Sequence, residues 1–125
     1  MKKIMVVDDN PNLSALLEAT LQNVYDLAFA SDGEEALKRA MSEKPDLILL
    51  DIMLPKMDGF EVLNHLKKDP KTKSIPVVML SALSHQEERL KARQYGADGY
   101  IAKPFSPHFL LDTVSQFLSG EKEKP

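Results

Sequence analysis

A run of four aliphatic residues that ends in an aspartate constrains the fold of this chain more than any other stretch. The run covers residues 47–50 (Leu-Ile-Leu-Leu), closely follows Pro45, and is ended by Asp51. It is too short for a helix and is typical of a strand buried on both faces, as in a parallel sheet covered by helices. An ionised carboxylate is costly inside such a sheet, whereas at a strand's carboxyl end it points into the crevice where open α/β sheets bind ligands. We therefore predict that the function depends on Asp51.

The size and charge of the chain limit the classes of protein to which it can belong. A length of 125 residues suits a single domain with a full hydrophobic core. The 16 basic and 19 acidic residues give a net charge of −3, which argues against direct nucleic-acid binding through general positive charge. The absence of cysteine excludes disulfides and thiolate metal sites, and the first apolar run, residues 4–7, is too short for a signal core or a membrane span. We expect a cytoplasmic protein that does not enter a membrane.

Short apolar segments alternate with helical patterns along the chain. The segments with strand character are residues 4–7, 25–30, 47–50, 76–80 and 100–102. The expected helix starts are Asn10-Pro11, the capping pattern from Ser31 to Glu34, Asp58 with Glu61, Ser84 with Glu87, and Ser106-Pro107. Five strands alternating with five helices predict an α/β fold with a parallel sheet.

The fourth of these helices, which ends near Gly96, has little to bury. Its apolar residues are chiefly Leu90 and Tyr95, among several charged side chains. A helix with so small an apolar face is expected to be loosely held and able to shift.

Four of the five predicted strands end in residues that carry chemistry. Asp8 and Asp9 follow the first strand, and Asp51, Ser81 and Lys103 follow the third, fourth and fifth. In a parallel sheet these ends meet at one edge, where three carboxylates resist ionisation unless a cation neutralises them. Oxygen ligands without thiolates or imidazoles favour Mg²⁺, with Mn²⁺ as an alternative ion.

Such a metal, flanked by a lysine and a hydroxyl, suits a phosphoryl group. Lys103 can pair with one phosphoryl oxygen and Ser81 can hydrogen-bond another, so that Asp51 can act as a nucleophile and become an acyl phosphate. Taken singly, each residue has a more ordinary interpretation: Asp8 and Asp9 as acids at a helix start, Lys103 as a surface cation. The hypothesis depends on the combination.

This combination of motifs resembles the receiver domain of two-component response regulators, from Lys2 to about Leu118. The resemblance implies a flavodoxin-like, doubly wound, five-stranded parallel sheet of order 2-1-3-4-5 with five helices. We expect this receiver domain to cover residues 1–119, and the charged residues 120–125 to form a flexible tail. The resemblance further implies Mg²⁺-dependent phosphorylation of Asp51 by a histidine kinase or a phosphotransfer protein, with no enzymatic activity beyond the domain's own phosphorylation and dephosphorylation.

The resemblance also implies roles for individual residues. The implied metal ligands are the carboxylates of Asp9 and Asp51, Asp8 through a water molecule, and the backbone carbonyl of Met53. Ser81 and Lys103 are the implied catalytic groups, Ser81 and Tyr100 the implied switch pair, and the Lys103–Pro104 bond is expected to be cis. Met53 and Leu83 correspond to positions that flank the path of the hydrolytic water, and we expect them to lengthen the lifetime of the acyl phosphate.

Two surfaces are expected to meet partners. Similar receivers present the face of Ala15, Leu16 and Ala19 to the kinase, and Phe109 is a candidate anchor for an unknown downstream protein, the alternative being that it folds back onto the body. The charge pairs of dimerising receivers are incomplete here, because Gly99 stands where a second acid is usual.

Other functions remain open alternatives. The chain can be a receiver from a longer regulator or an intermediate in a phosphorelay. A phosphohydrolase of the haloacid dehalogenase type is less favoured, because Asp8-Asp9-Asn10 lacks that class's Asp-x-Asp spacing. A flavodoxin-like electron carrier is disfavoured, because no hydroxyl- and glycine-rich phosphate loop follows Val7.

Overall fold

Five parallel strands form one sheet in the computed structural model, which describes residues 1–81 and 86–119. The spatial order is β2-β1-β3-β4-β5, as the sequence predicted. Each strand lies within one residue of its predicted bounds: β1 (Lys3–Val7), β2 (Asp26–Ala30), β3 (Leu47–Asp51), β4 (Val77–Ser81) and β5 (Gly99–Ala102). All four pairings are parallel, so the carboxyl ends of the strands share one edge.

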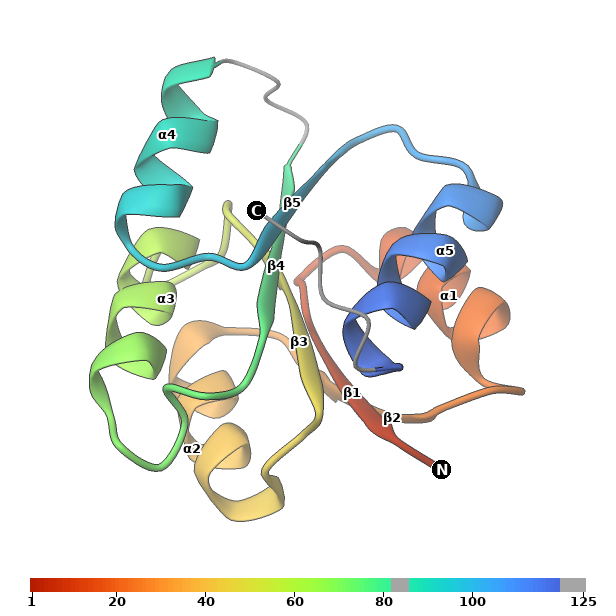
Figure 1. The fold of residues 1–125 in the computed structure, drawn as a ribbon, viewed down its shortest axis with the longest axis horizontal. Coiled ribbons are helices and arrows are strands. Elements are labelled where there is room, and N and C mark those ends of the chain that lie inside the picture. The colour runs from red at the N-terminus through yellow and green to blue at the C-terminus, as the bar shows by residue number, and fades with distance from the viewer. Residues whose placement is uncertain (82–85, 120–125) are drawn as a thin grey trace.

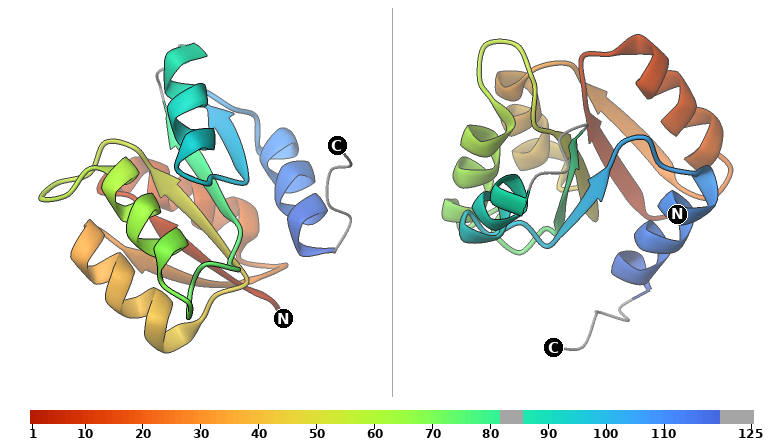
Figure 2. Two further views of the ribbon diagram at one scale, coloured as in Figure 1. Left: turned by 60° about the vertical axis from the view of Figure 1, so that its left-hand side comes forward. Right: turned by 90° about the horizontal axis from the view of Figure 1, so that it is seen from above.

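Helices cover both faces of the sheet and make three layers. The helices are α1 (Pro11–Leu21), α2 (Gly33–Glu43), α3 (Gly59–Lys68), α4 (Gln86–Gln94) and α5 (Pro107–Leu118). Figures 1 and 2 show α1 and α5 on one face and α2, α3 and α4 on the other. This is the doubly wound arrangement expected of alternating strands and helices. Over residues 1–81 and 86–119, no helix combines the length and the apolar character that spanning a membrane requires.

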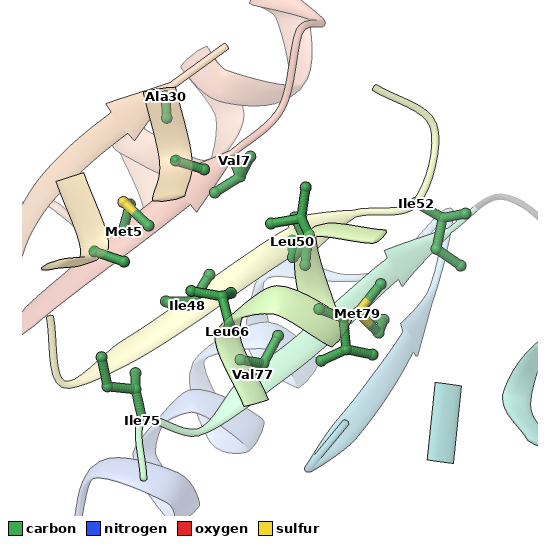
Figure 3. Packing of buried hydrophobic residues seen from close by; sticks show 14 of the residues in the cluster. Met5, Val7, Ala30, Ile48, Leu50, Ile52, Leu66, Ile75, Val77 and Met79 are labelled. Carbon is green, nitrogen blue, oxygen red and sulfur yellow. The ribbon is translucent and has the colours of Figure 1, made fainter. Parts of the chain in front are cut away.

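Alternate residues of the central strands supply two separate cores. In β3, Ile48 and Leu50 belong to the cluster under α2 and α3, shown in Figure 3, whereas Leu47 and Leu49 belong to the cluster under α1 and α5. All four side chains are fully buried. Because neighbouring side chains of a strand point to opposite faces, a sheet covered on both sides needs a continuous apolar run.

Polar caps fix the helix starts. Asn10, Asp58 and Ser106 accept hydrogen bonds from backbone N–H groups of the first turns of α1, α3 and α5, as expected. The predicted cap of α2 was wrong by one residue. Asp32, not Ser31, is the N-cap and accepts from the Glu35 N–H at 2.9 Å. In turn the Ser31 N–H donates to the Glu35 carboxylate, which reaches back over the helix start while Glu34 faces solvent.

Helix α4 buries even less than its sequence suggested. Ala92 is its one buried residue, and Leu90 is 53% exposed. Leu90, one of the chief apolar residues of this helix, is therefore turned outward, and Ala92 is buried in its place. The expected capping residue Ser84 lies outside the described residues.

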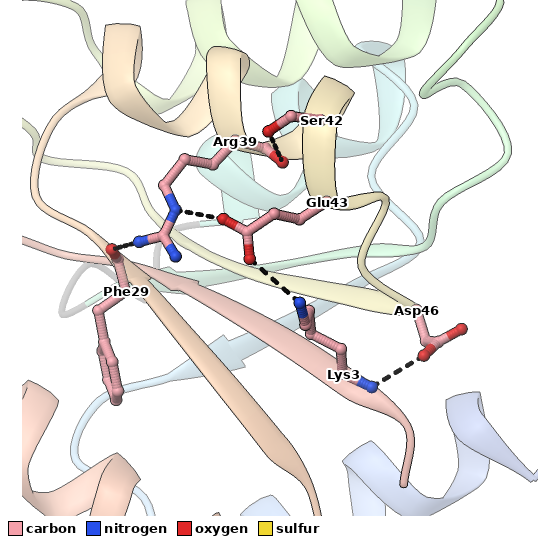
Figure 4. A network of polar contacts seen from close by, with 6 residues as sticks. All are labelled: Lys3, Phe29, Arg39, Ser42, Glu43 and Asp46. Atoms are coloured by element: carbon pink, nitrogen blue, oxygen red, sulfur yellow. Dashed lines mark hydrogen bonds and ion pairs between the residues drawn. The ribbon is translucent and has the colours of Figure 1, made fainter.

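A polar network ties α2 to the strands (Figure 4). The Arg39 Nε group donates to Glu43 at 2.6 Å and a second guanidinium N–H donates to the carbonyl of Phe29 in β2. The other Glu43 oxygen pairs with Lys3 Nζ of β1 at 3.1 Å, and the Lys3 backbone N–H donates to Asp46. These contacts hold α2 over the β1–β2 pair.

The end of α2 carries a residue in a strained backbone conformation. Lys44, its C-cap, has φ 46° and ψ 64°, the left-handed region that glycine adopts without a Cβ penalty.

We expect Lys44→Gly to raise the free energy of unfolding by about 1 kcal/mol, measured by urea denaturation. Lys38→Gly, at an exposed position inside the same helix, is the matched control and is expected to lower the free energy of unfolding by about 1 kcal/mol. Equal destabilisation of both variants would contradict the assignment of strain to Lys44.

Candidate functional site

Three carboxylates converge at the carboxyl edge of the sheet, as predicted. Asp8 and Asp9 follow β1, and Asp51 ends β3, which lies beside β1 in parallel register with Val7 opposite Leu50. One carboxylate oxygen from each aspartate lies within 4.8 Å of the others. Asp8 and Asp51 are buried and Asp9 is exposed, so the cluster opens to solvent on one side.

The Asp8 carboxyl group is buried without a hydrogen-bond partner in residues 1–81 and 86–119. Both of its oxygens are buried and lack a partner among the described residues. Burial, together with the neighbouring Asp51 carboxyl group, raises the pKa of Asp8 to about 6. A buried acceptor without a donor is costly, and a cation is the partner that would satisfy it. The all-oxygen set of three carboxylates fits a hard divalent ion.

Asp51 is held between a cation and a backbone donor. Lys103 Nζ lies 3.0 Å from Asp51 Oδ2, and the Met53 N–H donates to Asp51 Oδ1 at 3.1 Å. Lys103 is placed for this contact by its own N–H, which donates to the Ser81 carbonyl at 2.7 Å. The bond from Lys103 to Pro104 is cis, as expected. The Lys103 ammonium can therefore neutralise charge on Asp51 or on a group attached to it.

Gly59 is a positioning residue that the sequence analysis did not single out. It begins α3, and its N–H donates to the Ile52 carbonyl at 2.7 Å, which folds the β3–α3 loop back onto the end of β3. A Cβ at position 59 would lie 2.4 Å from the carbonyl oxygen of Asp51 and 2.6 Å from Ile52 Cα. The only sequence signal was a glycine directly after the capping Asp58, a pattern that by itself indicates a loop.

The predicted switch residues lie on neighbouring strands, Ser81 at the end of β4 and Tyr100 in β5, opposite Met79 of β4. Ser81 ends β4 and is buried, with Ala102 opposite it in β5. Tyr100 is half-buried and packs against the core layer beneath α3. The Met53 side chain is 68% exposed beside the acidic cluster, whereas Leu83, its predicted counterpart, lies outside the described residues.

The four predicted partner-surface residues are exposed. Ala15, Leu16 and Ala19 share an exposed face of α1. Phe109, in the first turn of α5, is 53% exposed and does not fold back onto the body. Their exposure is compatible with the predicted contacts, which stay predictions.

Comparisons with known proteins agree with this geometry. The family model described as "Response regulator receiver domain" matches residues 4–115. The alkaline phosphatase synthesis transcriptional regulatory protein PhoP of Bacillus subtilis is 49% identical over 118 residues, which cover 94% of this chain and 48% of PhoP. The chain therefore spans about half the length of this curated relative.

Solved structures share the fold over nearly the whole chain. The chemotaxis response regulator CheY4 of Vibrio cholerae superposes with a TM-score of 0.89 at 34% identity, covering 94% of this chain and 99% of CheY4. A second solved structure is the receiver domain of the sensor histidine kinase PA1611 from Pseudomonas aeruginosa, which has a magnesium ion coordinated in its active-site cleft. It superposes with a TM-score of 0.87 at 28% identity, covering 94% of this chain and 98% of the PA1611 chain. With its family match, its strand order and its acidic edge, this chain belongs to the response regulator receiver domain family.

Proposed function

We propose that this receiver domain accepts a phosphoryl group on Asp51 and uses it to switch the binding of a partner. The observation that carries the proposal is the position of the Asp51 carboxylate, 3.0 Å from the Lys103 ammonium and within 4.8 Å of the oxygens of Asp8 and Asp9. A carboxylate is a usable nucleophile toward phosphorus only where cationic groups balance the charge of both reactants.

The metal site of the proposal consists of the carboxylates of Asp8, Asp9 and Asp51 with the backbone carbonyl of Met53. The two unpartnered Asp8 oxygens and the all-oxygen donor set favour Mg²⁺, with Mn²⁺ as an alternative. The magnesium ion of the PA1611 receiver domain supports this choice. When bound, such an ion neutralises phosphoryl oxygens and the carboxylates around them.

The chain's own groups account for the rest of the transfer. An Asp51 oxygen forms a bond to phosphorus as the phosphorus–nitrogen bond to the donor's histidine breaks, and the electron pair of that bond stays with the imidazole. Lys103 pairs with the growing charge on the phosphoryl oxygens, and the Ser81 hydroxyl donates to one of them. Hydrolysis later returns the Asp51 carboxylate and inorganic phosphate.

Phosphorylation changes the charge at the edge of the sheet and thereby biases the elements beside it. The acyl phosphate adds about one negative charge to Asp51 and new acceptor oxygens for Ser81 and Lys103. Tyr100 and α4 are the elements expected to respond, because α4 buries only Ala92. A partner is switched to the extent that it prefers one arrangement.

The partners remain part of the proposal. A histidine kinase or a phosphotransfer protein is expected to dock on the α1 face of Ala15, Leu16 and Ala19. An unknown downstream protein is expected to bind at α4, β5 and α5, with Phe109 as an anchor. We propose the receiver unit as residues 1–119, acting in the cytoplasm without itself binding nucleic acid, either alone, within a longer regulator or in a phosphorelay.

The acceptor role of Asp51 is tested by intact mass. After incubation with Mg²⁺ and acetyl phosphate, we expect the wild type to gain the mass of one phosphoryl group. We expect Asp51→Asn to gain none and omission of Mg²⁺ to abolish the gain. Asp58→Asn, in the exposed cap of α3, is the matched control and is expected to be phosphorylated like the wild type. Steady release of phosphate from acetyl phosphate without an adduct would instead indicate a phosphohydrolase.

The buried Asp8 makes stability depend on pH. Its folded pKa of about 6 lies above the value of 3.8 for a free aspartate, so the folded state favours the protonated form. The resulting stability is present at low pH and is lost as the pH rises through 6. Without metal, we expect Asp8→Asn to raise the free energy of unfolding at pH 7.5 on the order of 2 kcal/mol and by less at pH 4.5. Urea titrations at both pH values check this, with Asp9→Asn as an exposed control. A gain that does not depend on pH would contradict it.

The exposed Met53 side chain is expected to lengthen the life of the acyl phosphate. The Met53 N–H donates to Asp51, and we expect the apolar side chain of this residue to limit the approach of water, whereas a polar amide can position a water molecule for attack. We expect Met53→Asn to accelerate decay several-fold, followed by intact mass after removal of acetyl phosphate. Met53→Leu, which keeps an apolar side chain, is expected to decay like the wild type. Unchanged or slower decay in Met53→Asn would refute the idea.

A further inference from the structure

Two cations of helix α4 lie over aromatic rings of neighbouring elements. The Arg89 guanidinium carbon is 5.0 Å from the centroid of the Tyr100 ring in β5. Lys91 Nζ is 4.5 Å from the centroid of the Phe60 ring in α3. Ala92 is the one buried residue of the helix. The two cation–π contacts therefore supply part of the stabilisation that other helices gain by burying an apolar face.

The contact of Arg89 acts on the strand that carries the predicted switch residue. A cavity of about 310 Å³ lies between α4 and β5, and Arg89, Arg93, Gly99 and Tyr100 are among its lining residues. The ring of Tyr100 therefore borders this cavity on the α4 side, and the Arg89 guanidinium lies over the face of the ring. Because the attraction between a guanidinium and a ring face decays over a few ångströms, it stabilises this position of the ring over one turned away from α4.

We infer that Arg89 is a positioning residue for the switch: by its contact with the Tyr100 ring it holds the ring on the α4 side of β5 in the unphosphorylated domain. This inference rests on the proposed function, in which phosphorylation of Asp51 shifts Tyr100 and α4. Removal of the Arg89 contact removes a stabilising interaction from the resting arrangement alone, so the arrangement that favours the phosphoryl group becomes more populated.

The helix itself provides matched controls. Arg93 lies one turn after Arg89, is exposed, lines the same cavity and lies over no aromatic ring of the described residues. Arg93→Gln therefore removes the same charge without removing a ring contact. Arg89→Lys keeps a cation but loses the planar guanidinium that stacks on a ring.

The first measurement needs no phosphorylation. In protein with ¹³C-labelled tyrosine rings, with the Tyr100 signal assigned by its loss in Tyr100→Phe, we expect Arg89→Gln to shift the Tyr100 ring resonances and leave those of Tyr25 unchanged. Arg93→Gln is expected to leave Tyr100 in place. A Tyr100 signal that does not respond to Arg89→Gln would overturn the inference.

The second measurement is the rate of phosphorylation by acetyl phosphate with Mg²⁺. For a partly exposed cation–π contact we expect Arg89→Gln to react roughly two- to fivefold faster than the wild type. Arg89→Lys should lie between them, and Arg93→Gln should match the wild type. Equal changes in Arg89→Gln and Arg93→Gln would mean a general charge effect, and a slower Arg89→Gln would place the contact in the phosphorylated arrangement; either result overturns the inference.

The two measurements separate this inference from the proposed function. If no variant, the wild type included, gains a phosphoryl group, the proposed function fails, and the assignment of Arg89 to a switch fails with it. The ring resonances would then still report the contact. If the wild type is phosphorylated and the Tyr100 ring moves in Arg89→Gln without any change in rate, the proposed function stands and the inference about Arg89 is wrong.

Discussion

Repulsion among the carboxylates of Asp8, Asp9 and Asp51 is the constraint on which the rest of this structure depends. Their oxygens lie within 4.8 Å of one another, and two of the three side chains are buried. Like charges in a poorly hydrated place cost free energy unless cations balance them, and the raised pKa of Asp8 reflects this cost. The Lys103 ammonium supplies one such cation at Asp51. The all-oxygen donor set of the three carboxylates suits a divalent ion as a second one.

The scaffold around this edge is rigid where the chemistry needs fixed distances. Two cores, one on each face of the sheet, hold the central strands, and Gly59 allows the loop after β3 to fold tightly onto the carbonyl of Asp51. The polar network of Arg39, Glu43 and Lys3 secures α2 over the first two strands (Figure 4). Side chains at the ends of packed strands are therefore held in place, which a preorganised site requires.

Helix α4 contrasts with this scaffold. It buries Ala92 alone, leaves Leu90 in solvent and contacts its neighbours through Arg89 and Lys91. Cation–π contacts of partly exposed cations are individually weak, so an element held by them is open to displacement by a modest change of charge nearby. Rigid placement of Asp51 and weak attachment of α4 together suit a domain in which a covalent change at one residue alters the surface that α4 presents to a partner.

The sequence by itself determined the strands, the starts of α1, α3 and α5, and the strand ends where Asp8, Asp9, Asp51, Ser81 and Lys103 stand, because apolar runs, caps and prolines act locally. The parallel register then made their convergence predictable. Only the tertiary structure decided which side chains meet across elements: Gly59 against Asp51, Arg89 on Tyr100, and Ala92 instead of Leu90 against the sheet. These contacts depend on how far and at what angle separate elements pack, which local patterns do not encode.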